Sequence, residues 1–396
     1  MRIGFVVGRF PTLSETFVIS QMVGLMKRGF EVGIVCEGIT DYPHLDRSKE
    51  SLSVLLAHTH DWWGKFGNLR PKIDRLPAKI KDKVSAGLDT LSVRRLNDFD
   101  AVVAHFGQNG ARVARLKKRV SIKPPIVTIF HGFDVGVPLR ENGLKQYRDL
   151  FKLGSLNLTV NQLFRHMLTE AGAPHDRTAV HHMGIDVTQI PFEWRSREGG
   201  PLQLISVCRL IEKKGIEFSL RALGQLYASR SELDWRYTVV GDGPLLDNLR
   251  DLTNELGISN RVTFLGSLAH HDVKLWLARS HVFILPSVTA SNGDLEGVPV
   301  ALMEAMASGL TVLSTYHSGI PELIEDHETG FLAAERDVSA LADKIGWIVE
   351  HPQVCRNIAH AARQKVEGEY NAETLNDQFA GLIAKLVRGS SAQLGL

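Results

Sequence analysis

Short runs of apolar and β-branched residues alternate with segments of helical periodicity along the whole chain. This alternation predicts parallel sheets covered by helices, the α/β class. The expected strands are residues 3–7, 31–35, 101–105, 126–130 and 156–160 in the first half, and 202–208, 236–240, 262–265, 281–285 and 311–314 in the second. A chain of 396 residues is also too long for one ordinary core. We therefore expect two doubly wound domains, which bind ligands beyond the carboxyl ends of their strands.

Two further segments help to divide the chain. Residues 194–201, Trp-Arg-Ser-Arg-Glu-Gly-Gly-Pro, have the composition of a linker between the two domains. A helix is expected from Ser14, whose side chain could cap it, to Gly29.

The composition predicts a soluble, cytoplasmic protein. Hydrophobic residues make up 44% of the chain and charged residues 23%, as in ordinary globular domains. The three cysteines, at positions 36, 208 and 355, are far apart and have no metal or redox spacing. The first residues read as a strand rather than a signal peptide, and no apolar run approaches the length of a membrane span.

The charge is distributed unevenly between the two halves. Residues 1–186 carry 27 Lys and Arg against 18 Asp and Glu, a balance of +9, whereas the remainder has a balance of −7. Much of the excess lies in residues 65–83 and 115–119, and Trp62, Trp63 and Phe66 stand beside the first cluster. Basic residues beside aromatics fit a peripheral contact with an anionic membrane. The alternative is a solvated surface; nucleic acid is disfavoured because no binding motif accompanies the charge.

Two carboxylates separated by seven residues, Glu296 and Glu304, mark the most informative segment. Pro299 suits the start of a helix and Gly309 its end, and the residues between them are apolar on nearly every face. Glu304 should therefore be buried, where a pair of sugar hydroxyls could satisfy it. Glu296 precedes a helix N terminus, which favours an anion such as a diphosphate. The sequence alone leaves a nucleotide-sugar site and a purely structural role equally open.

Other polar residues follow expected strands. Arg209 and Lys214 come after residues 202–208, and two cations there could neutralise a departing diphosphate. His131 follows residues 126–130 and could donate to a phosphate or sugar hydroxyl. Further expected loops at strand ends are Gly8 to Pro11, the turn Gly241 to Pro244, which would let a ligand approach closely, and Gly266 to Leu268, whose backbone could read a base. Each of these could equally be an ordinary loop.

Several functional classes are disfavoured. The first expected strand is not followed by G-x-G-x-x-G, which counts against a dinucleotide dehydrogenase, and the chain lacks a Walker-type phosphate loop. Asp98 and Asp100 form a D-x-D pair, but they precede a strand and are expected to form a turn. Neither His181-His182 nor His270-His271 has further zinc ligands nearby, so metal binding is not indicated.

Five motifs together resemble those of retaining glycosyltransferases of the GT-B fold, in the large family 4 group. They are Glu296-x₇-Glu304, Arg209…Lys214-Gly215, Gly241-Asp-Gly-Pro244, Pro286-Ser287 and Ser318-Gly-Ile-Pro-Glu322. The stretches 10–18 and 288–299 are similar to the sub-branch that builds bacterial exopolysaccharides, including colanic acid and amylovoran transferases. The resemblance covers nearly the whole chain and is more specific in the second half.

This resemblance implies two Rossmann-like domains that face a central cleft. An acceptor-side domain would span residues 1–194 and a nucleotide-sugar-binding domain residues 195–371. A C-terminal helix within 372–396 would pack back on the first domain.

The resemblance also implies roles for individual residues. Arg209 and Lys214 would hold the donor diphosphate, Glu296 would bind a hydroxyl of the transferred sugar, and His131 would approach that sugar; these four would form the catalytic set. Glu304 would accept hydrogen bonds from the ribose hydroxyls. The other donor-binding positions would be Gly8 near the phosphates, Ser267 and Leu268 at the base, and Gly297, Val298, Pro299, Val300 and Ala301 at the helix start. Relatives often carry two glycines where this chain has Gly8-Arg9, which weakens the assignment of Gly8.

The expected activity is metal-independent transfer of a hexose with retention of configuration, without a cofactor. UDP-hexose is the first expected donor and GDP-mannose the second, and the acceptor would be a lipid-linked saccharide or an oligosaccharide in exopolysaccharide synthesis. The alternatives are a GT-B phosphorylase or epimerase, or a catalytically silent nucleotide-sugar-binding partner in an assembly complex. The sequence does not specify the sugar, the nucleotide, the acceptor, the linkage or the oligomeric state.

Overall fold

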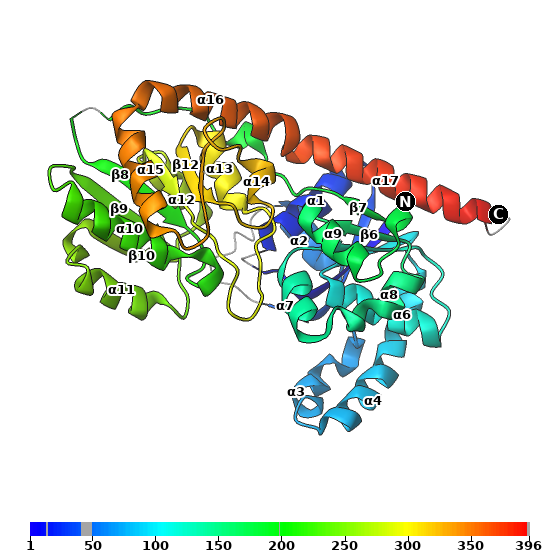
Figure 1. Ribbon diagram of the computed structural model, residues 1–396. Coiled ribbons are helices and arrows are strands. Elements are labelled where there is room, and N and C mark those ends of the chain that lie inside the picture. Colours follow the sequence, from blue (N-terminus) through cyan, green and yellow to red (C-terminus); the bar gives the residue numbers. More distant parts are fainter. Residues whose placement is uncertain (13–14, 41–49, 198, 394–396) are drawn as a thin grey trace. The chain divides into compact units, whose positions relative to one another are not determined.

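The computed structural model describes residues 1–12, 15–40, 50–197 and 199–393, which form two compact units (Figure 1). The first unit consists of Met1–His182 and Ala372–Leu396, and the second of Met183–Asn371. The chain therefore leaves the first unit at His182, whereas the sequence placed the division at residue 194. The expected linker 194–201 lies inside the second unit, and Ser14, the expected helix cap, lies outside the described residues.

A seven-stranded parallel sheet forms the centre of the first unit. Its strands are β1 (Arg2–Phe10), β2 (Glu31–Ile39), β3 (Thr59–Asp61), β4 (Ala101–His105), β5 (Ile126–Phe130), β6 (Leu156–Thr159) and β7 (Thr178–Val180). Their order is β3-β2-β1-β4-β5-β6-β7, so the direction of winding reverses between β1 and β4. Every residue of β4 and β5 is buried, which explains their uninterrupted apolar runs.

Helices cover this sheet and extend it at one edge. They are α1 (Thr16–Lys27), α2 (Glu50–Ala57), α3 (Arg70–Ile73), α4 (Ala78–Asp89), α5 (Val93–Asn97), α6 (Gly107–Arg119), α7 (Phe133–Asn142), α8 (Arg148–Leu153), α9 (Gln162–Glu170) and α17 (Ala372–Gln393). The last of these comes from the far end of the chain and packs along α1 (Figure 1). Arg28, at the end of α1, contacts Glu373 and Asp377 of α17 through ion pairs of 3.0 and 2.7 Å.

The second unit repeats the architecture with six parallel strands. They are β8 (Leu202–Val207), β9 (Trp235–Val240), β10 (Val262–Gly266), β11 (Val282–Ile284), β12 (Thr311–Thr315) and β13 (Phe331–Ala333), in the order β10-β9-β8-β11-β12-β13. The helices are α10 (Ile216–Ser229), α11 (Leu246–Glu255), α12 (His270–Leu277), α13 (Val300–Ser308), α14 (Ile320–Leu323), α15 (Val338–Glu350) and α16 (Pro352–Glu369). The winding reverses between β8 and β11.

The α/β fold class predicted from the sequence is confirmed, and all ten expected strands are present. Strands β3, β7 and β13, each three residues long, were missed, whereas the equally short β11 was predicted because it lies in a longer buried apolar run, residues 282–285. The first strand was predicted too short: β1 continues to Phe10, and Arg9 and Phe10 pair with Gly38 and Ile39 of β2. Gly8 therefore lies within a strand and not in the expected loop. The D-x-D pair behaves as expected, since Asp100 accepts a hydrogen bond from the backbone of Arg2 before β4 begins.

Candidate functional site

The site residues of the second unit gather at one edge of its sheet. Strands β8, β11 and β12 are neighbours, and the loops that follow them carry Lys214, Glu296 and His317. Helix α13 begins directly after the β11 loop, so its N terminus lies at the same edge. In a doubly wound sheet, ligands bind at the carboxyl edge where the strand order reverses. The reversal between β8 and β11 makes this edge the candidate site.

Lys214 and Glu296 form a buried ion pair at this edge. The Lys214 Nζ lies 2.6 Å from Glu296 Oε1, and only 5% of Glu296 is exposed. Burial alone would raise the pKa of Glu296, but the ammonium groups of Lys214 and Lys213 outweigh it and the pKa is lowered. Glu296 therefore stays ionised, and a carboxylate oxygen is available to a sugar hydroxyl.

Gly215 explains how the two side chains reach each other. Its φ of +64° is left-handed, and a Cβ at this position would lie 1.9 Å from the carbonyl oxygen of Pro286. Glycine alone fits both the conformation and the contact. The loop after β8 therefore approaches the loop after β11 closely enough for Lys214 to meet Glu296.

A histidine that the sequence analysis did not assign supports Glu296 from behind. The backbone N–H of Glu296 donates to His317 Nε2 at 3.1 Å. The ring proton therefore sits on Nδ1, which donates to Glu335 Oε1 at 2.5 Å. Glu335 also accepts from the Thr289 backbone, and Ser318 Oγ donates to the Glu296 carbonyl. The available sequence signal was the position of His317 directly before the Ser-Gly-Ile-Pro-Glu motif.

Glu304 lies about one turn into α13 and is mostly buried, with 18% of its side chain exposed. Burial raises the pKa of Glu304 to about 7, and the nearby Lys274 opposes the shift only in part. The nearest ion-pair partner in the described residues is His270, at 3.9 Å. A carboxylate that is desolvated with so little compensation is suited to accept hydrogen bonds from a ligand.

Helix α13, which follows Glu296 and contains Glu304, agrees with the prediction except at its first residue. Pro299 occupies the N-cap position rather than the first turn, and Gly309 ends α13 in a left-handed conformation with φ of +91°. The first turn contains Val300 and Ala301, both half-buried. Since the first N–H groups of a helix lack intrahelical acceptors, this terminus can bind an anion.

Arg209, Ser267 and Leu268 lie at the ends of neighbouring strands of the same sheet. Arg209 follows β8 and is exposed; its guanidinium makes no hydrogen bond or ion pair with a described residue. Ser267 and Leu268 follow β10 and are exposed and half-buried respectively. All three are therefore accessible, as residues that bind a donor must be.

The turn Gly241 to Pro244 has a different role from the expected one. A Cβ at Gly241 would lie 1.8 Å from the carbonyl oxygen of Cys208, and one at Gly243 2.5 Å from that of Leu210. The glycines thus allow the loop after β9 to pack on the loop after β8. The prediction that this turn admits a ligand is unsupported, because its close neighbour is the protein backbone.

Gly8 and His131 belong to the first unit. His131 follows β5, and its Nε2 lies 3.0 Å from Nδ1 of the buried His105. Burial lowers the pKa of both histidines, which favours the uncharged rings. Asp134 fixes the loop by accepting from the backbones of His131 and Gly107. His131 is thus held as a neutral hydrogen-bonding group. At Gly8, a Cβ would meet nothing within 4 Å, so the backbone there borders open space.

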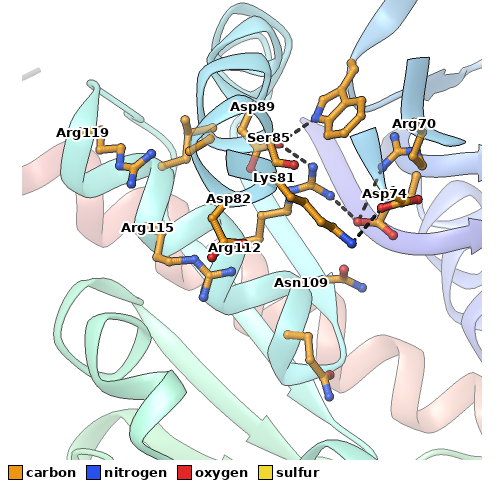
Figure 2. Close-up of a pocket in the computed structure, with 15 residues that line it drawn as sticks. Arg70, Asp74, Lys81, Asp82, Ser85, Asp89, Asn109, Arg112, Arg115 and Arg119 are labelled. Carbon is orange, nitrogen blue, oxygen red and sulfur yellow. Dashed lines mark hydrogen bonds and ion pairs between the residues drawn. The ribbon is translucent and has the colours of Figure 1, made fainter. Parts of the chain in front are cut away.

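The expectation that Trp62 and Trp63 touch a membrane is wrong. They are 1% and 3% exposed, and both indole N–H groups donate to Asp89 at 2.8 Å. The guanidinium groups of Arg112 and Arg70 stack on the two rings, 4.4 and 4.2 Å from the centroids. These aromatics form a core beside the basic residues that line the hollow in Figure 2.

Each unit contains a parallel sheet in which the strand order reverses once, and the second unit adds two mostly buried glutamates beside the N terminus of a helix. These features define a protein of the GT-B class, and comparisons with known proteins agree with this assignment. Residues 188–365 match the family "Glycosyl transferases group 1", and residues 14–189 match "Glycosyltransferase Family 4". A solved structure of Anabaena HepE in complex with UDP-glucose has a TM-score of 0.73 at 20% identity, over 97% of this chain and all of that one. Sucrose-phosphate synthase from Thermosynechococcus elongatus has a TM-score of 0.77 at 16% identity, over 98% and 100%.

Relatives with higher sequence identity show to which sub-branch of the glycosyltransferases the chain belongs. WcaL of Escherichia coli (strain K12), provisionally named a colanic acid biosynthesis glycosyltransferase, is 34% identical over 98% of this chain and all of its own. AmsK of Erwinia amylovora, an amylovoran biosynthesis glycosyltransferase, is 31% identical over 98% and 100%. The chain therefore belongs to the group 1 and family 4 glycosyltransferases, in the sub-branch of the colanic acid and amylovoran enzymes.

Proposed function

We propose that this glycosyltransferase moves a hexose from a nucleotide-sugar to a saccharide acceptor with retention of configuration and without a metal. The observation that supports it most is the Lys214–Glu296 ion pair just before α13, together with the mostly buried Glu304 one turn into that helix. Glu304 would bind the ribose, Glu296 the transferred sugar, and Arg209 and Lys214 the diphosphate. Burial of a carboxylate without a matching cation, as at Glu304, is unfavourable unless a ligand contributes hydrogen bonds.

The reaction would proceed from one face of the sugar. The bond between the anomeric carbon and the diphosphate oxygen breaks, and its electron pair stays on that oxygen. The acceptor hydroxyl then bonds to the anomeric carbon from the same face, and its proton passes to the departing phosphate. Arg209, Lys214 and the N terminus of α13 would stabilise the growing negative charge, which is the task that a metal performs elsewhere. Glu296 is already paired with Lys214, so a role as nucleophile is disfavoured.

UDP-hexose is the first proposed donor, and GDP-mannose is the second. The HepE structures with UDP and UDP-glucose favour a UDP-hexose donor. At 20% sequence identity, they show that the fold is shared. Relatives named GDP-mannose-dependent mannosyltransferases, 29% identical over half of this chain, favour the second. The names of WcaL and AmsK support a role in exopolysaccharide synthesis, with a lipid-linked saccharide or an oligosaccharide as acceptor.

We also propose a peripheral membrane contact, made by helix α4 in place of Trp62 and Trp63. None of the described helices is both long and apolar enough to span a bilayer. Helix α4, however, has no buried residue, and Ile80 and Val84 are 52% and 37% exposed, one turn apart. Lys79 and Lys83 accompany them and are also exposed. An apolar stripe flanked by lysines is suited to the surface of an anionic bilayer on the cytoplasmic side.

The test is thermal unfolding with UDP, GDP, ADP, dTDP and CMP, each with and without its common sugars. One nucleoside diphosphate should raise the midpoint, and its sugar form should release free nucleotide when an acceptor is supplied. Glu304→Gln should abolish the shift, Arg209→Ala should mainly slow transfer, and EDTA should leave both readouts unchanged. A flat panel together with no transfer from any donor would refute the function, and loss of activity in EDTA would refute metal independence.

A further inference from the structure

The first unit contains a polar hollow of about 780 Å³ that the proposed donor site does not use. Most of its lining residues come from α4 and α6 (Figure 2), and Glu37, near the carboxyl end of β2, also lines it. The N terminus of α6 follows β4, so the hollow lies beside the strand reversal of the first sheet. This position is where a doubly wound sheet binds ligands.

Some of the charged residues in the hollow form a rigid frame. Arg112 binds both oxygens of Asp89, at 3.0 and 2.5 Å, and also contacts Glu37. Lys81 pairs with Asp74 at 2.8 Å. These charges are compensated within the protein (dashed lines in Figure 2), and the contact between Arg112 and Asp89 links α6 to α4 beside the hollow.

Two arginines of the hollow lack such compensation. Arg115 and Arg119 extend from α6 without a dashed line in Figure 2, and neither forms a hydrogen bond or ion pair with a described residue. Arg70, by contrast, forms ion pairs of 3.9 Å with Glu37 and 3.6 Å with Asp61, so its charge is compensated within the protein. Since Arg115 and Arg119 are four residues apart on one helix, they repel each other unless an anion lies between them.

The charge of the hollow suits a small dianion. Asp82 on α4 is its one carboxylate, within the described part of the chain, without a hydrogen bond or ion pair. The other carboxylates, Glu37, Asp74 and Asp89, already have cationic partners. One helical turn separates the Arg115 and Arg119 backbones by about 6 Å. Two guanidinium groups at this spacing can each bind one phosphate of a diphosphate, whereas a single carboxylate would occupy only one.

We propose that this hollow binds a diphosphate group, with Arg115 and Arg119 as its principal ligands. The diphosphate would be the one that joins the acceptor saccharide to its carrier, and this second statement rests on the proposed function. The arrangement would place a lipid-linked acceptor next to α4, whose exposed apolar stripe lies about 100° around the helix axis from the pocket-lining Lys81 and Ser85.

Calorimetric titration with inorganic pyrophosphate tests the site. The protein should carry Arg209→Ala and Lys214→Ala, so that the cations of the second unit cannot contribute. Adding Arg115→Gln and Arg119→Gln should raise the Kd at least about tenfold, the loss of one good charge-assisted contact. Lys118→Gln, which removes a charge from the same helix at an exposed ion pair with Asp149, should change the Kd less than about twofold.

Asp82→Asn should lower the Kd, and because this variant gains affinity, misfolding cannot mimic the result. Geranyl diphosphate then distinguishes the sources: tighter binding than pyrophosphate indicates a lipid diphosphate, and equal binding a soluble phosphorylated saccharide. Unchanged pyrophosphate affinity in the double glutamine variant would overturn the proposal. So would equally tight binding of glucuronic acid, which would assign the hollow to an acidic sugar. Neither outcome depends on nucleotide binding in the second unit, so the two proposals fail separately.

Discussion

Glu304 combines a cost to the folded protein with a proposed function. Its pKa of about 7 lies above the ordinary value of 4.5, so the folded state binds the proton more tightly than the unfolded chain. The associated stability is complete below about pH 4.5 and is lost as the pH rises through about 7. At pH 7 the Glu304 carboxyl of the free enzyme is therefore about half ionised, and hydrogen bonds from a ribose diol would stabilise the ionised form.

We expect Glu304→Gln to remove this dependence. Between pH 5 and pH 8 the wild type should lose up to about 3 kcal/mol of unfolding free energy relative to the variant. Urea denaturation at both pH values measures the difference. Parallel profiles for the two proteins would show that the carboxyl titrates normally.

The residue scale also shows what the sequence could and could not predict. Lys214, Glu296 and Glu304 were found because their spacing and the glycine and proline beside them are local signals. His317 was missed because its partner is a backbone N–H that lies 21 residues earlier in the chain. The tryptophans were misjudged because Asp89, which accepts from both, follows Trp63 by 26 residues. Composition within a short window cannot reveal such distant partners.

At the scale of the element, strands within long apolar runs were predictable, and short strands outside such runs were not. The limits of β4 and β5 coincide with the expected 101–105 and 126–130, because a strand buried on both faces is apolar throughout. The helix between Pro299 and Gly309 was equally clear. A three-residue strand such as β13 has too few positions to show a period.

Helix α4 should control membrane association. Ile80→Glu and Val84→Glu place charges in its exposed apolar stripe and should abolish co-flotation with vesicles that contain anionic lipid, at low salt. Val354→Glu in α16 is the matched control, since Val354 is 44% exposed outside this stripe. Equal flotation of all three proteins, or none for the wild type, would exclude this helix as the contact.

At the scale of the whole molecule, the first unit depends on α17. Phe379 is fully buried, and its ring stacks on His181 with centroids 5.3 Å apart. Phe379→Ala should cost about 3 to 5 kcal/mol of unfolding free energy, as for other buried phenylalanines. Leu382→Ala, at a position that is 37% exposed, should cost far less. Hydrogen exchange followed by peptide should show the loss in residues 1–182; a loss confined to 183–371 would contradict this division.

The return of α17 to the first unit also has a consequence for synthesis on the ribosome. Residues 183–371 form a unit of contiguous sequence and can complete their core once they have emerged. The first unit is translated earlier, yet Gly24 packs against Asn376, and Arg28 has its carboxylate partners in α17. The apolar surface of α1 that α17 covers therefore stays exposed while almost two hundred further codons are translated. The half of the enzyme that is made first is the half that finishes folding last.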